Sequence, residues 1–243
     1  MKFGSGRAIA LLVVAGAMFA GLAHSALAQD SNSYLYIAHA ASGRNVSSAA
    51  NPEYPIDVSA NGTCIAAGLS FGEIRGPFTI PAATVAFSIS KANSETPCSE
   101  PAVFTSNTPM AAAVTYVGVV FLTSTNDIWG NLYPADLSPM AVGETRALVI
   151  NATEQSLSAT VTPDPRTDGT GGQFNVAPGA IGVAAPRNGV NYTSVYLGGT
   201  NTLEAGPVSI ETLSRNVYVY IFAGSATNGS VQLLGPKIIR GVF

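Results

Sequence analysis

The stretch Ile56-Asp57-Val58-Ser59-Ala60-Asn61-Gly62-Thr63-Cys64-Ile65 decides the fold class of this chain. Apolar and polar residues alternate over its first four positions, which is the period of a half-buried β-strand. Asn61-Gly62 then supplies the residue pair that most readily adopts the positive φ angles of a two-residue hairpin turn. The segment therefore predicts two antiparallel strands joined by a tight turn.

Similar strand patterns occur on both sides of this hairpin, and no stretch has a convincing helical period. Further strands are expected at residues 34–40, 77–80, 85–90 and 113–122. Charged residues make up only 10% of the chain, whereas it contains 25 Gly and 15 Pro. This composition suits many short strands joined by turns, so the sequence predicts an all-β protein.

The second half of the chain repeats the order of these patterns. Residues 147–152 correspond to 35–40, and residues 157–161 correspond to the strand that begins at Ile56. Further along the chain, residues 174–185 correspond to 71–83, residues 192–197 to 85–90, and residues 217–222 to 115–122. Residues 231–234 and 237–243 supply one or two closing strands. We therefore expect tandem immunoglobulin-like antiparallel β-sandwiches, with one larger sandwich without duplication as the alternative.

A domain junction is expected between the two halves, because residues 123–143 are interrupted by turn-forming residues. The expected units are then a first β-sandwich unit at 29–142 and a second at 143–243. The sole tryptophan, Trp129, falls in this junction together with Asn126, Asp127, Asn131 and Tyr133. The indole could stack on a sugar ring while the neighbouring amides hydrogen-bond the sugar hydroxyls. The alternative is that Trp129 fills the gap between the two sandwiches.

The amino terminus has the features of a cleaved signal peptide over residues 1–28. Lys2 and Arg7 precede an apolar run at 8–23, and Ser25-Ala26-Leu27-Ala28 presents small residues to a signal peptidase. A membrane anchor is the alternative, but the apolar run is short and contains two glycines. The mature chain is expected to be secreted, periplasmic or on the cell surface, with no integral membrane segment.

Cysteine use and charge narrow the expected environment and partners. The two cysteines, Cys64 and Cys98, both lie in the mature chain, so export predicts a disulfide bond between them. That bond would contribute about 4 kcal/mol on the chain-entropy model. A net charge of −3 provides no basic face for nucleic acid.

A family resemblance rests on several short motifs. His39-Ala40-Ala41-Ser42 is followed by Ile56-Asp57-Val58, Asn61-Gly62, Gly68-Leu69-Ser70-Phe71-Gly72 and Ile80-Pro81-Ala82. In these motifs the chain resembles the secreted bacterial domain-of-unknown-function family 4397, over most of the mature length. The resemblance implies tandem β-rich units in an exported or cell-surface protein, and it implies no activity. The chain departs from the family pattern at Gly43-Arg44-Asn45, and it has Asn151 in the second unit where the first has His39.

Catalysis is not expected, although Gly68-Leu69-Ser70-Phe71-Gly72 matches the Gly-x-Ser-x-Gly nucleophile elbow of hydrolases. The residues that follow, 73–77, cannot begin a stable helix, and His39 lies upstream of Ser70 whereas that fold places its histidine downstream. A Ser70-dependent hydrolase is therefore a remote alternative. His39 and Asp57 are expected to play structural polar roles, with Asp57 either pairing with His39 or capping a turn, and no metal or cofactor is expected.

The sequence thus predicts a secreted or cell-envelope β-sandwich protein that serves as a non-catalytic interaction or surface-structural module. Its partner would be an unknown protein or a cell-surface glycan. The alternative is a carbohydrate-binding module that uses the segment around Trp129.

Overall fold

The computed structural model describes residues 31–41, 55–125, 127–163, 174–200, 202–225 and 231–239. These ranges belong to one compact unit, Ser31–Phe243. Every regular element in the described ranges is a β-strand, which confirms the predicted all-β class. The expected signal peptide at residues 1–28 lies outside the described residues.

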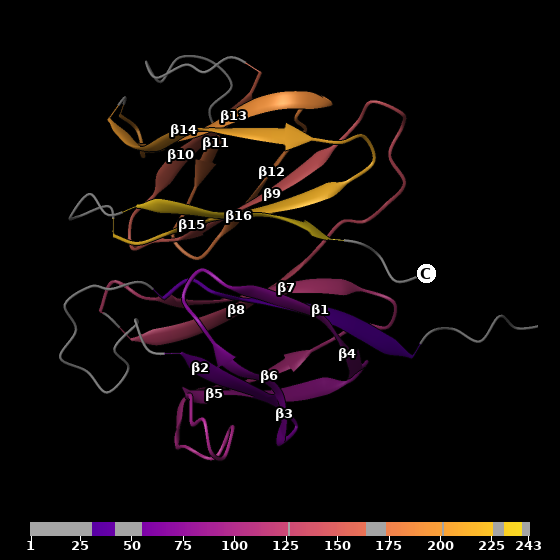
Figure 1. Ribbon diagram of the computed structural model, residues 1–243, viewed down its shortest axis with the longest axis vertical. Helices are drawn as coiled ribbons and strands as arrows, with labels where there is room; N and C mark the ends of the chain where they lie inside the picture. Colours follow the sequence, from indigo (N-terminus) through magenta and orange to yellow (C-terminus); the bar gives the residue numbers. More distant parts are fainter. Residues whose placement is uncertain are drawn as a thin grey trace, which may run out of the picture. The chain divides into compact units, whose positions relative to one another are not determined.

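The first eight strands form two four-stranded sheets (Figure 1). One sheet has the order β4-β1-β7-β8 and the other has the order β3-β2-β5-β6. The strands are β1 (Asn32–His39), β2 (Ile56–Ala60), β3 (Thr63–Leu69), β4 (Ile74–Pro81), β5 (Thr84–Lys91), β6 (Ala102–Pro109), β7 (Thr115–Leu122) and β8 (Ile128–Pro134).

The last eight strands have the same arrangement, with eight added to each strand number. Their sheets have the orders β12-β9-β15-β16 and β11-β10-β13-β14. The strands are β9 (Arg146–Ala152), β10 (Leu157–Thr162), β11 (Phe174–Val176), β12 (Ile181–Ala184), β13 (Gly189–Leu197), β14 (Leu203–Thr212), β15 (Val217–Ala223) and β16 (Gln232–Ile239).

The predicted hairpin is present as the pair β2 and β3. Asn61 and Gly62 both have positive φ angles, 49° and 76°, which is the backbone geometry that a type I′ turn requires. An asparagine and a glycine adopt this geometry with little steric cost, so the local sequence is sufficient to place the turn.

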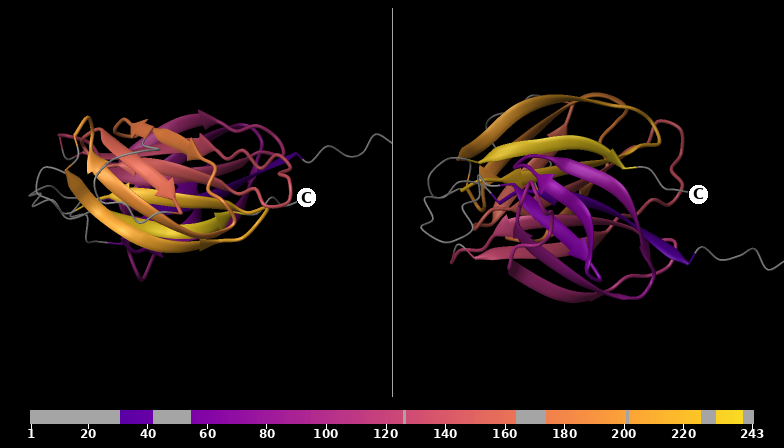
Figure 2. Two further views of the ribbon diagram at one scale, coloured as in Figure 1. Left: turned by 90° about the horizontal axis from the view of Figure 1, so that it is seen from above. Right: turned by 60° about the horizontal axis from the view of Figure 1, so that its bottom comes forward.

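Figure 2 shows the sheets from two further directions, and three apolar clusters hold them together. One cluster lies between the two sheets of the first half, and includes Leu35 of β1 and Val58 of β2. An equivalent cluster between the sheets of the second half includes Val149 of β9 and Ala159 of β10. The third cluster joins the outer faces of β1 and β7 to those of β9 and β15, so all four sheets share buried apolar contacts within the unit.

The sheets are rich in antiparallel pairs but are not wholly antiparallel. β1 pairs with β7 in parallel, and β9 pairs with β15 in parallel. Parallel neighbours need a long connection between them. The intervening strands β2 to β6 and β10 to β14 provide that connection.

The expected loop at residues 123–143 is wrong, because β8 occupies its middle part and pairs with β7 along its whole length. An outer strand needs only one partner, so it tolerates Gly130 in its interior and Pro134 at its end. The irregular connection between the halves is therefore confined to the stretch between Pro134 and Arg146.

A further difference from the sequence-based expectation concerns two other outer strands. β6 and β14 were not expected, because β6 has no fully buried residue and β14 has only two, so neither shows the apolar pattern of an inner strand. The closing segment forms a single strand, β16, that continues through Gly235-Pro236 with a shift of register opposite Val219 and Ile221.

Candidate functional site

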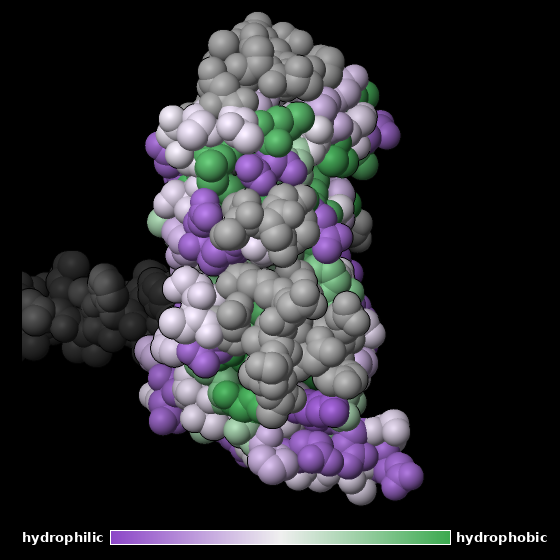
Figure 3. All heavy atoms as spheres, turned by 90° about the vertical axis from the view of Figure 1, so that its left-hand side faces the viewer, coloured by the Kyte–Doolittle hydropathy of each residue, from purple (hydrophilic) through white to green (hydrophobic). Residues whose placement is uncertain are grey.

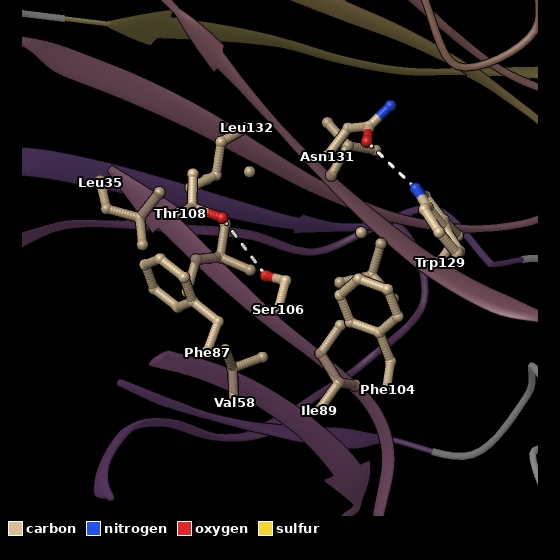
Figure 4. Close-up of a pocket in the computed structure, with 15 residues that line it drawn as sticks. Leu35, Val58, Phe87, Ile89, Phe104, Ser106, Thr108, Trp129, Asn131 and Leu132 are labelled. Carbon is tan, nitrogen blue, oxygen red and sulfur yellow. Dashed lines mark hydrogen bonds between the residues drawn. The ribbon is translucent and has the colours of Figure 1, made fainter. Parts of the chain in front are cut away.

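A hollow lies inside the first half, between its two sheets (Figure 4). Its volume is about 340 Å³, which lies within the range of small-ligand pockets. The lining is mainly apolar and comes from β1, β2, β5, β6, β7 and β8. It includes Leu35, Val58, Phe87, Ile89, Phe104, Gly118, Trp129, Gly130 and Leu132.

Two glycines on neighbouring strands let other side chains of the lining pack close to the backbone. Gly118 of β7 and Gly130 of β8 both line the hollow. A Cβ atom on Gly118 would lie 3.0 Å from Leu132 Cδ2, and a Cβ on Gly130 would lie 3.2 Å from Phe104 Cε1. Neither glycine has a positive φ angle, so backbone geometry does not require glycine at either position. Each glycine instead leaves room for a neighbouring side chain, Leu132 at Gly118 and Phe104 at Gly130.

The matching positions of the second half hold large side chains. Tyr116 and Tyr218 fix the correspondence, because they pair with Leu35 and Ala147 at the same place in the parallel ladders. Two residues later, Gly118 corresponds to Tyr220, whose side chain is fully buried.

The next inward position shows the same contrast. Val120 of β7 pairs with Gly130, whereas the corresponding Phe222 of β15 pairs with Leu233. Phe222 is buried in the core of the second half. Rings and a leucine thus occupy positions in the second half where the first half has glycine and valine.

The hollow also contains two hydroxyl groups. Ser106 and Thr108 of β6 line it, and their side-chain oxygens lie 3.3 Å apart. Thr108 pairs with Val85 on β5, and the matching pair in the second half is Asn191 with Ile210. A mainly apolar cavity with a few polar groups is typical of a small-molecule site.

The outer strands β6 and β8 border the hollow on one side. Phe104 of β6 and Trp129 of β8 face each other there, with ring centroids 5.2 Å apart. Neither strand carries a charged residue. By contrast, three other outer strands, β4, β14 and β16, have an interior Gly-Pro step and at least one charged residue. The β6/β8 side is therefore the less protected side of the first sandwich.

Trp129 was predicted to lie in a junction loop, and the structure places it on β8 instead. Its side chain is 47% exposed, so it does not fill a gap between the sandwiches. The indole Nε1–H donates to Asn131 Oδ1 at 3.1 Å. The single tryptophan thus stands at the edge of the hollow in a fixed orientation (Figure 4).

The other residues predicted beside Trp129 are only partly brought together. Tyr133 is buried, and its hydroxyl donates to the carbonyl oxygen of Gly179 at 2.6 Å. Burial raises the pKa of the Tyr133 hydroxyl. Asp127 accepts a hydrogen bond from Thr125 Oγ1 before β8 begins, and it does not line the hollow. Asn126 lies outside the described residues.

A second hollow, of about 420 Å³, lies on the other side of Trp129. Trp129 and Asn131 line both hollows. The second one is more polar, since its lining includes Thr123, Ser124, Thr153 and Glu154. We refer to the first as the apolar hollow and to the second as the polar groove.

His39 and Asp57 are both buried, but they lie on different sheets and are not bonded to each other. In the described part of the chain, Asp57 accepts hydrogen bonds from the backbone N–H groups of Gly68, Asn93 and Cys98, at 2.7, 3.2 and 2.7 Å. Its carboxylate therefore joins β3 and the loop after β5 to β2.

His39 has a local structural role at the end of β1. Its Nδ1 accepts a hydrogen bond from the N–H of Ala41 at 3.3 Å. The matching residue in the second half, Asn151, accepts one from the N–H of Thr153 through Oδ1 at 2.9 Å. Both side chains therefore stabilise the chain two residues further on.

Ser70 lies in the turn between β3 and β4. Its N–H donates to the Glu73 carboxylate at 3.1 Å, and a strand follows at Ile74 where a nucleophile elbow requires a helix. The Arg75 guanidinium and hydrogen bonds to Glu73 lower the pKa of that carboxyl, although desolvation opposes them. Ser70 is exposed, whereas His39 is fully buried against Phe71.

Cys64 and Cys98 lie at disulfide-bonding distance, with Cα atoms 5.7 Å apart, as predicted. Among the described residues, no group of three or more His, Cys, Asp or Glu side chains is arranged to hold a metal ion. Within the same ranges, no helix has the length and apolar character of a membrane span.

No protein-family model matches the chain, and no curated protein matches its sequence. The site therefore has to be interpreted from its own geometry.

The sequence identified Trp129 but missed Gly118, Gly130 and Phe104. The available signal was glycine at an inward-facing position of a strand, which often marks a close approach or an open space. Gly130 was instead interpreted as a residue that breaks regular structure.

Proposed function

We propose that the mature chain is an exported, non-catalytic binding protein that holds an apolar ligand in the apolar hollow of its first half. The observation that carries this proposal is the contrast between Gly118 and Tyr220 at matching positions. A cavity left only by imperfect packing is costly, because interiors are normally close-packed. The second half demonstrates that the same strand arrangement can be filled.

The two halves are, in this proposal, tandem immunoglobulin-like sandwiches with a boundary between residues 142 and 143. Their identical strand orders support this. A further support is a hydrogen bond typical of such domains: the hydroxyls of Tyr116 and Tyr218 accept from the N–H groups of Ala111 and Leu213, each five residues earlier. The resemblance to family 4397 agrees with this arrangement and stays a prediction.

Export is also part of the proposal. The leader-like composition of residues 1–28 and the cysteine pair at disulfide distance support it. Mass spectrometry of the protein from an exporting bacterial host should give an amino terminus at Gln29. A chain that retains Met1 after export would contradict cleavage at Ala28.

Binding to the apolar hollow can be tested with N-phenyl-1-naphthylamine, a neutral probe whose fluorescence rises in apolar surroundings. We expect saturable binding to the mature protein. Gly118→Leu should weaken binding by at least about tenfold, because the added side chain occupies the hollow. Val183→Leu adds bulk at an exposed site of β12 and serves as the control.

A second variant keeps this test decisive if Gly118→Leu folds poorly. Thr108→Ile introduces the residue that the second half has at the matching position, Ile210. It should also weaken probe binding while the protein keeps its β circular dichroism spectrum. Equal binding by wild type, Gly118→Leu and Thr108→Ile would contradict the proposal.

Carbohydrate binding is the second candidate, because the exposed indole of Trp129 adjoins the polar groove. It predicts that Trp129→Ala abolishes retention on a glycan array with almost no change in melting temperature. If the wild type binds free sugars and does not bind N-phenyl-1-naphthylamine, carbohydrate binding is favoured over binding of an apolar ligand.

A hydrolase that depends on Ser70 is the remote alternative. Ester turnover by the wild type that disappears in Ser70→Ala would support it, and equal rates in both proteins would oppose it. The turn geometry at Ser70 and the separation of its exposed hydroxyl from a buried histidine favour the non-catalytic proposal.

A further inference from the structure

The apolar hollow has polar side chains at two places on its lining. Trp129 and Asn131 belong to β8, whereas Ser106 and Thr108 belong to β6. The donors on β8 are used within the protein: the indole N–H of Trp129 bonds to Asn131 Oδ1, and Asn131 Nδ2 donates to the Gly179 carbonyl oxygen at 3.1 Å. The hydroxyls of β6 are therefore the side-chain donors that remain for a ligand.

Ser106 and Thr108 keep hydrogen-bonding capacity after they bond to each other. Their oxygens lie 3.3 Å apart and point toward each other within the lining (Figure 4). Among the described residues, neither hydroxyl has another hydrogen-bond partner. Because one hydroxyl donates to the other, the pair has one hydrogen left to donate and lone pairs left to accept. It can thus bind one hydroxyl or carbonyl group of a ligand.

The two halves place their polar residues on different strands at this level. The first half has apolar residues on inner strand β5 and hydroxyls on outer strand β6, whereas the second half has polar residues on inner strand β13 and apolar residues on outer strand β14. The facing pairs are Val85–Thr108 and Phe87–Ser106 in the first half, and Asn191–Ile210 and Thr193–Val208 in the second. The polar groups of the second half are buried on an inner strand, and those of the first half are half-buried on a strand that borders the hollow.

The lining also limits the charge of a ligand. None of the described residues that line the apolar hollow is charged. A carboxylate or an amine that entered it would lose its hydration without meeting a counter-ion, which is costly in apolar surroundings. An uncharged ligand avoids this cost.

We propose that the ligand of the apolar hollow is an uncharged, mainly apolar molecule that carries one hydroxyl or carbonyl group, which Ser106 and Thr108 bind. The apolar side chains of the lining contact the rest of the molecule. This inference rests on the proposed function and adds the ligand class.

The outer surface agrees with a recessed site for a small molecule. On the face drawn in Figure 3, apolar residues form small separate groups among polar ones, wherever the surface is not grey. A broad apolar patch would indicate a large protein partner or a membrane surface. The visible part of this face has no such patch.

The test compares three ligands that share one ring system and differ in one substituent. At neutral pH, 1-methylnaphthalene and 1-naphthol are uncharged and similar in size, whereas 1-naphthoate is an anion. Their affinities for the mature protein are measured by displacement of N-phenyl-1-naphthylamine. We expect 1-naphthol to bind at least about threefold more tightly than 1-methylnaphthalene, because its hydroxyl bonds to those of β6. In a wholly apolar cavity this order would be reversed, since the hydroxyl would lose its hydration without compensation. 1-Naphthoate should bind at least about tenfold more weakly than 1-naphthol.

The double variant Ser106→Ala/Thr108→Val removes both hydroxyls and changes the shape of the lining little. It should bind 1-methylnaphthalene at least as tightly as 1-naphthol. If the double variant folds poorly, Thr108→Val alone keeps the test decisive, and it should lower the preference for 1-naphthol by at least about twofold. Thr105→Val is the matched control, because Thr105 lies on the same strand at an exposed position and does not line the hollow. It should keep the wild-type preference.

The outcomes separate this inference from the proposed function. If the wild type binds N-phenyl-1-naphthylamine but binds 1-methylnaphthalene as tightly as 1-naphthol, the apolar site stands and the ligand class is wrong. An unchanged preference for 1-naphthol in the double variant, or tightest binding of 1-naphthoate by the wild type, would also overturn the ligand class. If the wild type binds neither the probe nor any of the three ligands, both proposals are wrong.

Discussion

Gly118 of β7 and Tyr220 of β15 occupy the same place in their sheets, two residues after a tyrosine that is hydrogen-bonded to the backbone five residues earlier. Gly118 lines the hollow of the first half, whereas the second half has a fully buried ring at this position. The same strand arrangement is therefore packed differently in the two halves. The difference depends on a few inward-facing side chains.

The hydroxyl group of Tyr218 should stabilise the folded state, whereas the hydroxyl group of Tyr220 should not. Tyr218 accepts a hydrogen bond from Leu213 N–H at 2.6 Å, whereas the buried Tyr220 hydroxyl has no partner in the described part of the chain. Tyr218→Phe should lower the free energy of unfolding by about 1–2 kcal/mol, and Tyr220→Phe should leave it unchanged or raise it by about 1 kcal/mol. Urea unfolding measures both. A greater loss in Tyr220→Phe than in Tyr218→Phe would contradict the hydrogen bonding described above.

Tyr220 should also make stability depend on pH in the alkaline range. Burial, and then the neighbouring Tyr218, raise the pKa of the Tyr220 hydroxyl above its ordinary value of 10.0. The folded state therefore keeps this proton when the unfolded chain releases it. Stability is fully present below pH 10 and falls as pH rises above it. Melting curves from pH 8 to 11 should show a steeper loss for wild type than for Tyr220→Phe, and identical slopes would refute this assignment.

Replacement of Asp57 should destabilise the protein more than replacement of most other polar residues of the first half, because its carboxylate accepts hydrogen bonds from three backbone N–H groups. Asp57→Ala leaves these donors without a partner and should lower the free energy of unfolding by about 3 kcal/mol. Asp127→Ala, which removes an exposed carboxylate before β8, should cost less than about 0.5 kcal/mol. Denaturant titration of both variants provides the comparison, and similar losses would show that Asp57 does not organise these loops.

His39 should be replaceable by the residue that the second half uses. In His39→Asn, the amide oxygen can accept the Ala41 N–H as Asn151 accepts the Thr153 N–H. We expect His39→Asn to melt within a few degrees of wild type and to bind N-phenyl-1-naphthylamine equally well. His39→Leu removes the acceptor and should be clearly less stable. If His39→Asn folds normally but no longer binds the probe, His39 has a role in function that its contacts do not explain.

The sequence predicted the inner strands better than the outer ones, for a physical reason. β1, β5, β7 and β15 are buried on one or both faces, so their side chains follow strand patterns. β6 and β8 each have a single neighbouring strand, and exposed positions there are free to hold Ser, Thr, Asn, Gly or Pro. Their pairing is decided by contacts with distant strands, which local patterns do not report.

The candidate site was predicted only through Trp129. The hollow depends on which strand faces which, because Gly118 and Gly130 become neighbours in space through the parallel and antiparallel pairings of β7. His39 and Asp57 do not pair with each other. Each instead binds backbone N–H groups near its own strand end or loop.

Xenon binding in a crystal of the mature protein tests the central claim most directly, because xenon occupies dry apolar cavities. The account predicts a xenon atom in the apolar hollow of the first half and none beside Tyr220 in the second half. No xenon in the first half, or equal occupancy in both halves, would contradict a binding cavity made by Gly118.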